Sequence, residues 1–171
     1  MFLQGFDMNS KGRVFPFILT LGVILADQLT KWLITVSIPV NGIGVSLGGD
    51  FFRIIHARNT AIAFSVGTAL PPVFKIILFS AVPLIVLCAI SVYLVKTDSL
   101  TSLQRWAACG IVGGGVGNLI DRIFRPLGVV DFLDVKFYGL FGLDRWPTFN
   151  VADAAIVLCG FLLVISFVKS K

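Results

Sequence analysis

Long apolar runs separated by short polar connections dominate this chain of 171 residues. A helix rises about 1.5 Å per residue, so a run of roughly 20 apolar residues crosses the ~30 Å hydrocarbon core of a bilayer. Four runs reach this length, and we predict membrane spans at residues 14–38, 73–95, 103–124 and 150–168. Pro83 falls inside the second run, where we expect it to kink the helix because proline lacks an amide hydrogen.

The period of the pattern changes between the first and second spans. Residues 42–47 and 51–64 partly alternate apolar with polar positions, which predicts short strands outside the membrane. Residues 125–148 form a second extramembrane connection between the third and fourth spans. The predicted fold class is an all-α membrane protein with four transmembrane helices, organised as a single domain over residues 1–171, with both loop-borne elements on one side.

Composition supports the membrane assignment. The chain is 57% hydrophobic and 13% charged, with a mean hydropathy of +0.96, which is too apolar for an ordinary water-soluble domain. Its net charge of +5 indicates anchoring to anionic lipid rather than nucleic-acid binding. Basic residues are equally numerous on the two sides of the predicted spans, but those on the terminal side lie in compact flanks, which favours cytoplasmic termini.

The histidine and the cysteines exclude several classes of chemistry. His56 is the single histidine, and it lies in an alternating stretch typical of a polar strand face. Cys88, Cys109 and Cys159 are each set in a separate apolar run, so we interpret them as packing residues and expect no disulfide. The spacing of these residues does not suit a metal site or a Ser-His-Asp triad.

Polar residues inside the predicted spans are the informative ones, because a charged side chain in hydrocarbon needs a partner, a water-lined cavity or a function. Asp27 and Lys31 are four residues apart and share one helix face, so the simplest interpretation is an intramembrane ion pair. That pair is equally compatible with one wall of a polar site. Asn118, Asp121 and Arg122 also share a face of the third span.

Asp121 is most simply the acid of an ion pair with Arg122 or Arg125 at the membrane boundary. The glycines before it show small-xxx-small spacing, which allows close helix packing: they are Gly110 with Gly114 and Gly113 with Gly117. A nucleotide-binding loop is excluded for these glycines, because they lie inside a span and no strand precedes them.

Two further aspartates, Asp131 and Asp153, map to the same membrane face. Asp131 has apolar neighbours, and Asp153 begins the last span, both settings that can raise the pKa of a carboxyl. Asp153 has a second interpretation as the third residue of a helix capped by Asn150, which the local sequence leaves open. Two carboxyls held close share a proton, which is the division of labour in aspartic proteases.

Five motifs, in this order, resemble those of the lipoprotein signal peptidases (signal peptidase II) over nearly all of residues 14–168: Asp27-Gln28-Leu29-Thr30-Lys31, Arg58-Asn59-Thr60 with Ala63-Phe64-Ser65, Gly113-Gly114-Gly115-Val116-Gly117-Asn118-Leu119-Ile120-Asp121-Arg122, Val130-Asp131-Phe132 and Phe149-Asn150-Val151-Ala152-Asp153. The family pattern usually has glycine two residues after the asparagine of the second motif, whereas this chain has Ala61 there, followed by Ile62. That departure affects the expected loop shape near Asn59 and not the aspartate pair.

The resemblance implies an intramembrane aspartyl endopeptidase of the bacterial cytoplasmic (inner) membrane. Such enzymes remove signal peptides from prolipoproteins by cutting on the amino side of the diacylglyceryl-modified cysteine. Catalytic roles then fall to Asp131 and Asp153. The other motif positions around the site are Asp27, Lys31, Asn59, Asn118, Asp121, Arg122, Asn150 and Ala152.

The family architecture adds a small extracytoplasmic β-cradle after the first helix and a short extracytoplasmic helix after the third. It implies cytoplasmic termini and an active site near the extracytoplasmic face. Prolipoprotein substrates and membrane lipid are the expected partners, without nucleic acid, metal or cofactor, and we expect a monomer.

Three alternatives remain at this point. A small transporter or channel would use Asp27, Lys31 and Asp121 as an intramembrane pathway, and would show solute flux without dependence on Asp131. A Ser/Lys peptidase using Lys31 lacks a suitable serine, since Ser65 lies in a loop. A purely structural scaffold would not need two aspartates at one interface.

Overall fold

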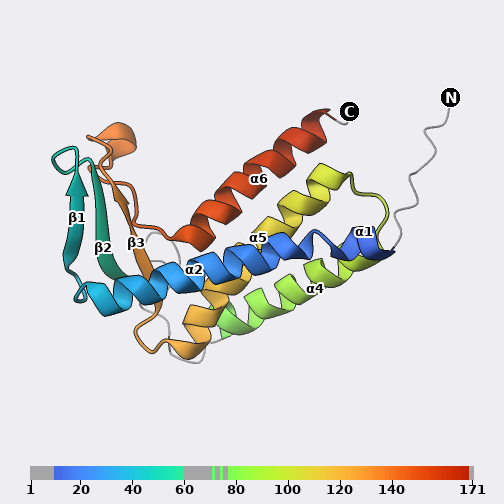
Figure 1. The fold of residues 1–171 in the computed structure, drawn as a ribbon, viewed down its shortest axis with the longest axis horizontal. Coiled ribbons are helices and arrows are strands. Elements are labelled where there is room, and N and C mark those ends of the chain that lie inside the picture. Colours follow the sequence, from blue (N-terminus) through green and yellow to red (C-terminus); the bar gives the residue numbers. More distant parts are fainter. Residues whose placement is uncertain (1–9, 60–70, 72–73, 75–76, 170–171) are drawn as a thin grey trace.

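The computed structural model describes residues 10–59, 71, 74 and 77–169. A bundle of helices carries a small sheet at one end (Figure 1). The helices are α1 (Ser10–Val14), α2 (Phe17–Ser37), the π-helical turn η2 (Ile77–Ala81), α4 (Val82–Lys96), α5 (Ser102–Phe124), the 3₁₀ turn η3 (Leu140–Gly142) and α6 (Val151–Lys169). The strands are β1 (Ile43–Leu47), β2 (Phe52–Asn59) and β3 (Val129–Val135).

Three helical stretches among the described residues are long and apolar enough to cross a membrane: Gly12–Ser37, Ile77–Lys96 and Val151–Lys169. Their outer surfaces are apolar, as shown by Leu25 on α2, Ile85 on α4 and Val157 on α6, which are 60%, 67% and 69% exposed. Such surfaces are expected where lipid, not water, surrounds the helices. These stretches correspond to the first, second and fourth predicted spans.

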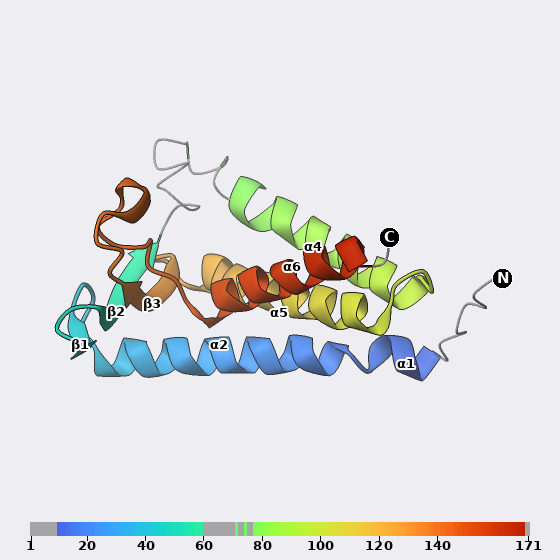
Figure 2. The same ribbon diagram turned by 90° about the horizontal axis from the view of Figure 1, so that it is seen from above.

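Helix α5 corresponds to the third predicted span and occupies the centre of the bundle, packed against α2, α4 and α6 (Figure 2). It starts with a capping box, in which Thr101 accepts from the Gln104 amide at 3.3 Å and its own amide donates to the Gln104 side chain at 3.0 Å. This central helix is more polar than its neighbours and contributes more of the buried polar side chains than any other described helix.

The glycines of α5 allow the close packing that their spacing predicts. A methyl group added at Gly113 would lie 2.9 Å from both the Thr20 carbonyl oxygen and the Val23 side chain of α2. A methyl group at Gly114 would collide with the carbonyl of Ala152 on α6. The glycines therefore bring three helices together where the polar residues of α5 begin.

Pro83 lies in the first turn of α4, directly after the π-helical turn η2 and within the continuous helical stretch Ile77–Lys96. The irregularity expected at Pro83 lies in the π-helical turn before it, because proline lacks an amide hydrogen and crowds the preceding turn. The start of the predicted second span and the departure at Ala61 and Ile62 lie outside the described residues.

The sheet has the antiparallel order β1-β2-β3. β1 and β2 confirm the two predicted strands, whereas β3 was predicted only as part of a connection. Val130 and Phe132 of β3 pack with Ile34 and Ile38 at the end of α2, which fixes the sheet to the bundle. The segment after β3 contains the three-residue turn η3 where the family resemblance implies a short helix.

His56 contradicts its interpretation as a polar strand-face residue, because it is 2% exposed. Its Nδ1 lies 2.7 Å from the Ile38 carbonyl oxygen at the C-cap of α2, and its backbone carbonyl accepts from the Asn41 amide at 2.7 Å. The side chain thus joins the sheet to the free carbonyl end of α2, and a register shift between Ile54 and Ala57 of β2 accompanies this contact.

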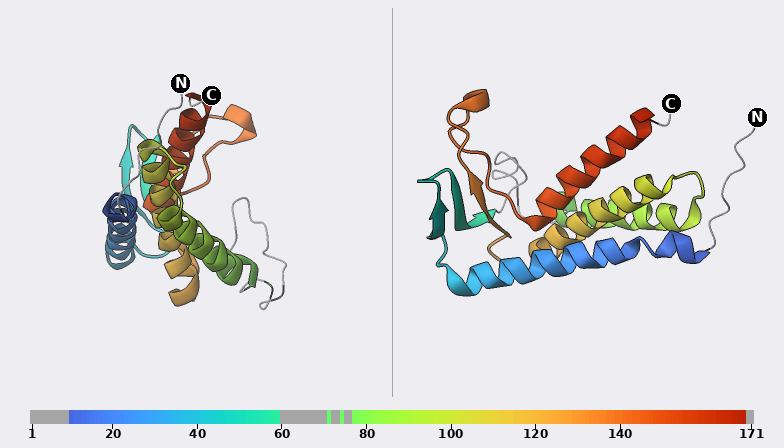
Figure 3. Two further views of the ribbon diagram at one scale, coloured as in Figure 1. Left: turned by 90° about the vertical axis from the view of Figure 1, so that its right-hand side faces the viewer. Right: turned by 45° about the horizontal axis from the view of Figure 1, so that its top comes forward.

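The start of α1 and the end of α6 lie at the end of the bundle opposite the sheet (Figure 3).

Candidate active site

Polar side chains from four elements meet where the bundle joins the sheet. α2, the last turns of α5, the start of β3 and the start of α6 each contribute to this cluster. Its members are Asp27, Gln28, Lys31, Asn118, Asp121, Asp131, Asn150 and Asp153, with Asn59 from β2 at its edge.

The centre of the cluster is Lys31, whose side chain is fully buried. Its Nζ lies 2.8 Å from Asp27 Oδ2, which confirms the predicted pair, and 3.1 Å from Asp121 Oδ2. All three side chains are 0% exposed. Gln28 donates to both Asp27 and Asp121 at 3.1 Å and to the Gly117 carbonyl at 3.0 Å. Gln28 belongs to the first sequence motif, but its position in the motif did not predict these contacts.

Asp121 connects α5 to the sheet as well as to α2. Its second ion pair is with Arg125 at 2.9 Å, which decides between the two predicted arginines, and its Oδ2 accepts from the Val130 amide at 3.1 Å. Arg122 instead lies within electrostatic reach of Asp131 and Asp153.

Asp27 connects the cluster to α6. Its Oδ1 accepts from the backbone amide of Ala152 at 3.0 Å, and Ala152 is 0% exposed. Backbone amides in the first turn of a helix have no acceptor within the helix. The Asp27 carboxylate supplies one for Ala152 and so holds the start of α6 against α2. Gly117 permits this contact, because a methyl group there would lie 2.7 Å from Asp27 Oδ2.

Asp131 is 3% exposed and is held by amide groups. Its Oδ1 accepts from Asn150 Nδ2 at 2.7 Å and its Oδ2 accepts from Asn59 Nδ2 at 3.1 Å. Burial raises the pKa of the Asp131 carboxyl to about 6, and the charge of Asp153 acts in the same direction, although the two hydrogen bonds oppose the change.

Asp153 takes part in the helix cap and also contacts the cluster. Its backbone amide donates to Asn150 Oδ1 at 2.9 Å, and its Oδ2 accepts from the Asn150 amide at 3.2 Å, so the predicted helix cap is confirmed. Its Oδ1 remains available to the cluster and accepts from Asn118 Nδ2 at 2.7 Å.

Asn118 and Asn150 join the two carboxyls into one unit. Asn150 Nδ2 donates to Asn118 Oδ1 at 3.0 Å, and each asparagine donates to one of the two aspartates. Within the described residues, no lysine or arginine forms an ion pair with Asp131 or Asp153. Two carboxyls in this setting suit proton sharing and the activation of water.

Comparisons with known proteins agree with this geometry. The sequence model of the family described as signal peptidase (SPase) II matches residues 19–169. The chain is 50% identical over 149 residues to the lipoprotein signal peptidase of Treponema pallidum, covering 87% of this chain and 80% of that protein. It is 47% identical over 170 residues to the lipoprotein signal peptidase of Borreliella burgdorferi, covering 96% and 98%.

Solved structures give the same result for the fold. The chain superposes on a structure described as a bacterial membrane enzyme with a TM-score of 0.75 at 26% identity, covering 91% of this chain and 88% of that one. The family match favours the peptidase interpretation over the transporter, channel and scaffold alternatives.

Proposed function

This chain belongs to the signal peptidase II family, and we propose that it uses Asp131 and Asp153 as an aspartic pair to remove signal peptides from prolipoproteins. The observation that carries the proposal is the bridged arrangement of the two carboxyls. They are joined through Asn118 and Asn150, and Asp131 keeps its proton to about pH 6. An aspartic mechanism needs one ionised and one protonated carboxyl, and this environment favours that combination.

The proposed topology has four spans, in which α5 is the third and joins the three helical stretches that are long and apolar enough to cross a membrane. Its 23 residues match a bilayer crossing, and the apolar surfaces of α2, α4 and α6 surround it. We place the sheet and the carboxyl pair near the extracytoplasmic face and both termini in the cytoplasm. The sheet and the ends of α1 and α6 lie at opposite ends of the bundle, which supports placing them on opposite sides of the membrane (Figure 3). The compact basic flanks on the terminal side support cytoplasmic termini. The enzyme acts as a monomer in this proposal.

The substrate in this mechanism is a prolipoprotein whose cysteine carries a diacylglyceryl group. Its signal helix approaches from the lipid, and its scissile carbonyl lies beside Asp131 and Asp153. The ionised carboxylate takes a proton from water as the water oxygen bonds to the carbonyl carbon. The protonated carboxyl donates a hydrogen bond to the carbonyl oxygen, which stabilises the tetrahedral intermediate.

Collapse of that intermediate breaks the bond to the cysteine nitrogen. The carboxyl that took the proton from water returns it to the leaving amine, and the other carboxyl keeps its own proton, so the pair regains its starting state. Asn118 and Asn150 hold the carboxyls in place throughout, since neither amide gains or loses a proton in this pH range. The remaining motif positions, including Arg122 and Ala152, shape the site around them.

The test is cleavage of a purified lipidated precursor by Asp131→Asn and Asp153→Asn enzymes. Each variant should fold, because asparagine has almost the same shape, and each should cleave at least ~10³-fold more slowly, within the range for loss of a general acid or base. Thermal unfolding in detergent provides the control for folding. Wild-type turnover by either variant contradicts the aspartic assignment.

A second precursor tests the cleavage position. Its cysteine is replaced by serine, so that it carries no diacylglyceryl group. The wild-type enzyme should leave this precursor uncut and should cut the lipidated one on the amino side of its cysteine, as mass spectrometry of the products would show. Equal cleavage of both precursors contradicts the proposed requirement for the lipid.

A further inference from the structure

Lys31 uses all three of its ammonium hydrogens within the cluster. Its Nζ lies 2.8 Å from Asp27 Oδ2, 3.1 Å from Asp121 Oδ2 and 3.0 Å from Asn118 Oδ1. The two carboxylates balance the positive charge of Lys31, and the third contact is to the uncharged amide of Asn118. Asn118 in turn donates to Asp153, one of the two carboxyls of the pair.

A lysine ammonium can only donate hydrogen bonds, so the atom of Asn118 that faces it must be the oxygen. The amide nitrogen of Asn118 is thereby turned toward Asp153, to which it donates at 2.7 Å. A reversed amide would place its N–H₂ against the ammonium and its oxygen against the Asp153 carboxylate. Both contacts would be repulsive in a buried site.

Asn150 is oriented by a different group. Its Oδ1 accepts from the backbone amide of Asp153 at 2.9 Å, so its nitrogen must point to the Asp131 carboxyl, 2.7 Å away. The first turn of α6 therefore anchors Asn150, whereas Asn118 Oδ1 is held by two donors, Lys31 Nζ and Asn150 Nδ2. Their mutual hydrogen bond of 3.0 Å is consistent with both orientations being fixed.

We propose that Lys31 is a positioning residue for the reaction, because it fixes the direction of the Asn118 amide and so maintains a hydrogen-bond donor toward Asp153. This inference rests on the proposed function of Asp131 and Asp153. It assigns to a buried ion pair a role beyond helix packing. Lys31 acts through Asn118 and touches no reacting atom.

The surrounding charges bear on any pH measurement at this site. The charged and titratable groups that face the cluster come from every element packed around it: Asp27 from α2, Asp121, Arg122 and Arg125 from α5 and its end, Arg58 from β2, Asp131 from β3 and Asp153 from α6. Asp27 and Lys31 are a matched pair of opposite charges, so removing both leaves the net charge of the cluster unchanged. Replacing a complete buried ion pair is often tolerated by the fold, unlike removal of one partner.

The experiment uses the double variant Asp27→Asn/Lys31→Met. Asparagine can still accept from the Ala152 amide, and methionine fills the space of lysine without donating to Asn118. We expect kcat to fall about tenfold and the acid limb of the pH–kcat profile, which reports formation of the ionised carboxylate, to move about one unit to higher pH, the size expected for one lost hydrogen bond to an ionised group. KM should not change.

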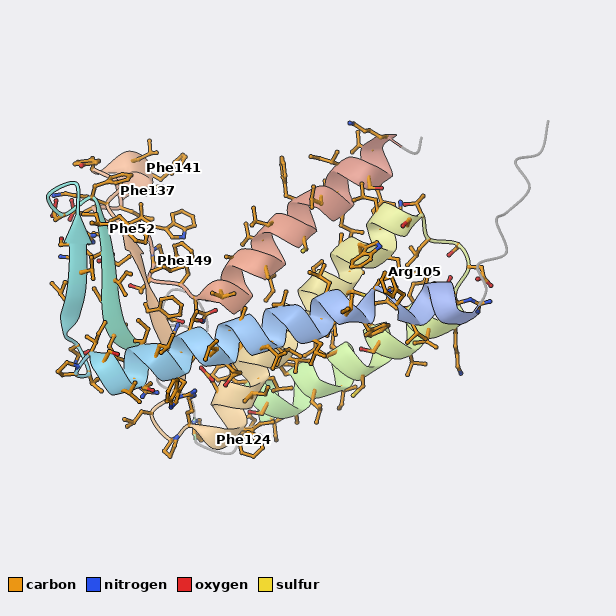
Figure 4. The ribbon with its side chains drawn as sticks, viewed as in Figure 1. Phe52, Arg105, Phe124, Phe137, Phe141 and Phe149 are labelled. Carbon is orange, nitrogen blue, oxygen red and sulfur yellow. The ribbon has the colours of Figure 1, made fainter. Side chains whose placement is uncertain are left out.

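Asp27→Asn/Lys31→Gln provides a second variant with the same net charge as the first. Glutamine can still donate to Asn118 Oδ1, so the pH profile of this variant should move in the same direction by a smaller amount. Arg105→Gln is the matched control. Arg105 is also a fully buried cation, placed in the first half of α5 away from the cluster, where it donates to the Leu94 and Thr97 carbonyls (Figure 4).

Arg105→Gln should lower the thermal midpoint and leave the pH profile unmoved, which is the result expected of a merely structural cation. An unmoved profile in folded Asp27→Asn/Lys31→Met enzyme would overturn the inference, as would equal shifts for glutamine and methionine at position 31 when both variants fold. Asp131→Asn and Asp153→Asn are measured alongside. If either retains turnover, the proposed function itself fails; if both are inactive, an unmoved profile counts against Lys31 alone.

Discussion

Two aspartates of β3, Asp131 and Asp134, are both almost completely buried, yet their surroundings differ. Asp134 is 2% exposed and lies between two arginines, with Arg53 and Arg145 each 2.7 Å from one of its oxygens. Asp131 is 3% exposed, and the described residues that donate hydrogen bonds to it are the neutral amides of Asn59 and Asn150. Three residues of separation place the two side chains on opposite faces of the strand.

At equal burial, the charge of the neighbouring groups separates a structural carboxylate from one suited to proton transfer. Two guanidinium groups pair with Asp134 and make it a fixed link between β2, β3 and the segment after them. Amide donors hold Asp131 in position without supplying a positive charge, so its proton is available near neutral pH. The sequence left Asp134 unassigned, and its partners identify it as structural.

The largest expected effect concerns the pH dependence of stability. The Asp131 carboxyl has a folded-state pKa of about 6 against an ordinary value of 3.8, so the folded protein binds more protons between these values. Folding stability should therefore fall as the pH rises from 3.8 through about 6, by about 3 kcal/mol, and then remain level. Thermal unfolding of wild type and Asp131→Asn over this range measures the difference, because the variant lacks this fall.

Asp153→Asn refines the same measurement. Burial is the larger cause of the raised pKa of Asp131, and the charge of Asp153 is the smaller one. The fall in folding stability should therefore span a narrower pH range in this variant than in wild type, but it should not disappear. Parallel stability curves for wild type and Asp131→Asn would contradict the assigned environment.

A smaller effect is expected from Asp134→Asn. Loss of the carboxylate leaves Arg53 and Arg145 facing a neutral amide, which should cost about 1–3 kcal/mol of unfolding free energy. Cleavage per folded molecule should stay near the wild-type rate, because Asp134 lies on the strand face away from the pair. A loss of turnover comparable to that of Asp131→Asn would remove the distinction between the two aspartates.

The smallest effect is expected from Asp50→Asn. Asp50 is 51% exposed and pairs with Lys136 at 2.9 Å on the outer part of the sheet. Exposed ion pairs contribute little because water screens them, so neither the thermal midpoint nor cleavage should change measurably. A clear destabilisation would show that surface charge holds the sheet together more than burial does.

Local contacts account for what the sequence could predict. Asp27 and Lys31 are one helical turn apart, and Asn150 and Asp153 lie within one helix cap, so spacing alone indicates both pairs. The family motifs supplied the grouping of Asp131 with Asp153, which lie on different elements. The helical segments were predictable because each is long and apolar.

Non-local contacts account for what spacing missed. β3 becomes a strand by pairing with β2, which lies 70 or more residues earlier in the chain, as the Asn59–Val129 pair shows. The bond from Gln28 to Asp121 and the burial of His56 likewise depend on elements that meet only in the fold. The local pattern of apolar and polar residues does not predict these contacts, because they depend on tertiary packing.

The capping box at the start of α6 makes the proposed reactive carboxyl part of the helix that carries it. Asp153 and Asn150 exchange two hydrogen bonds, and the same two residues donate to or accept from the rest of the cluster. Fraying of that first turn and disassembly of the site are consequently a single event. Hydrogen exchange at the Asp153 amide would therefore report the fraction of molecules competent for catalysis.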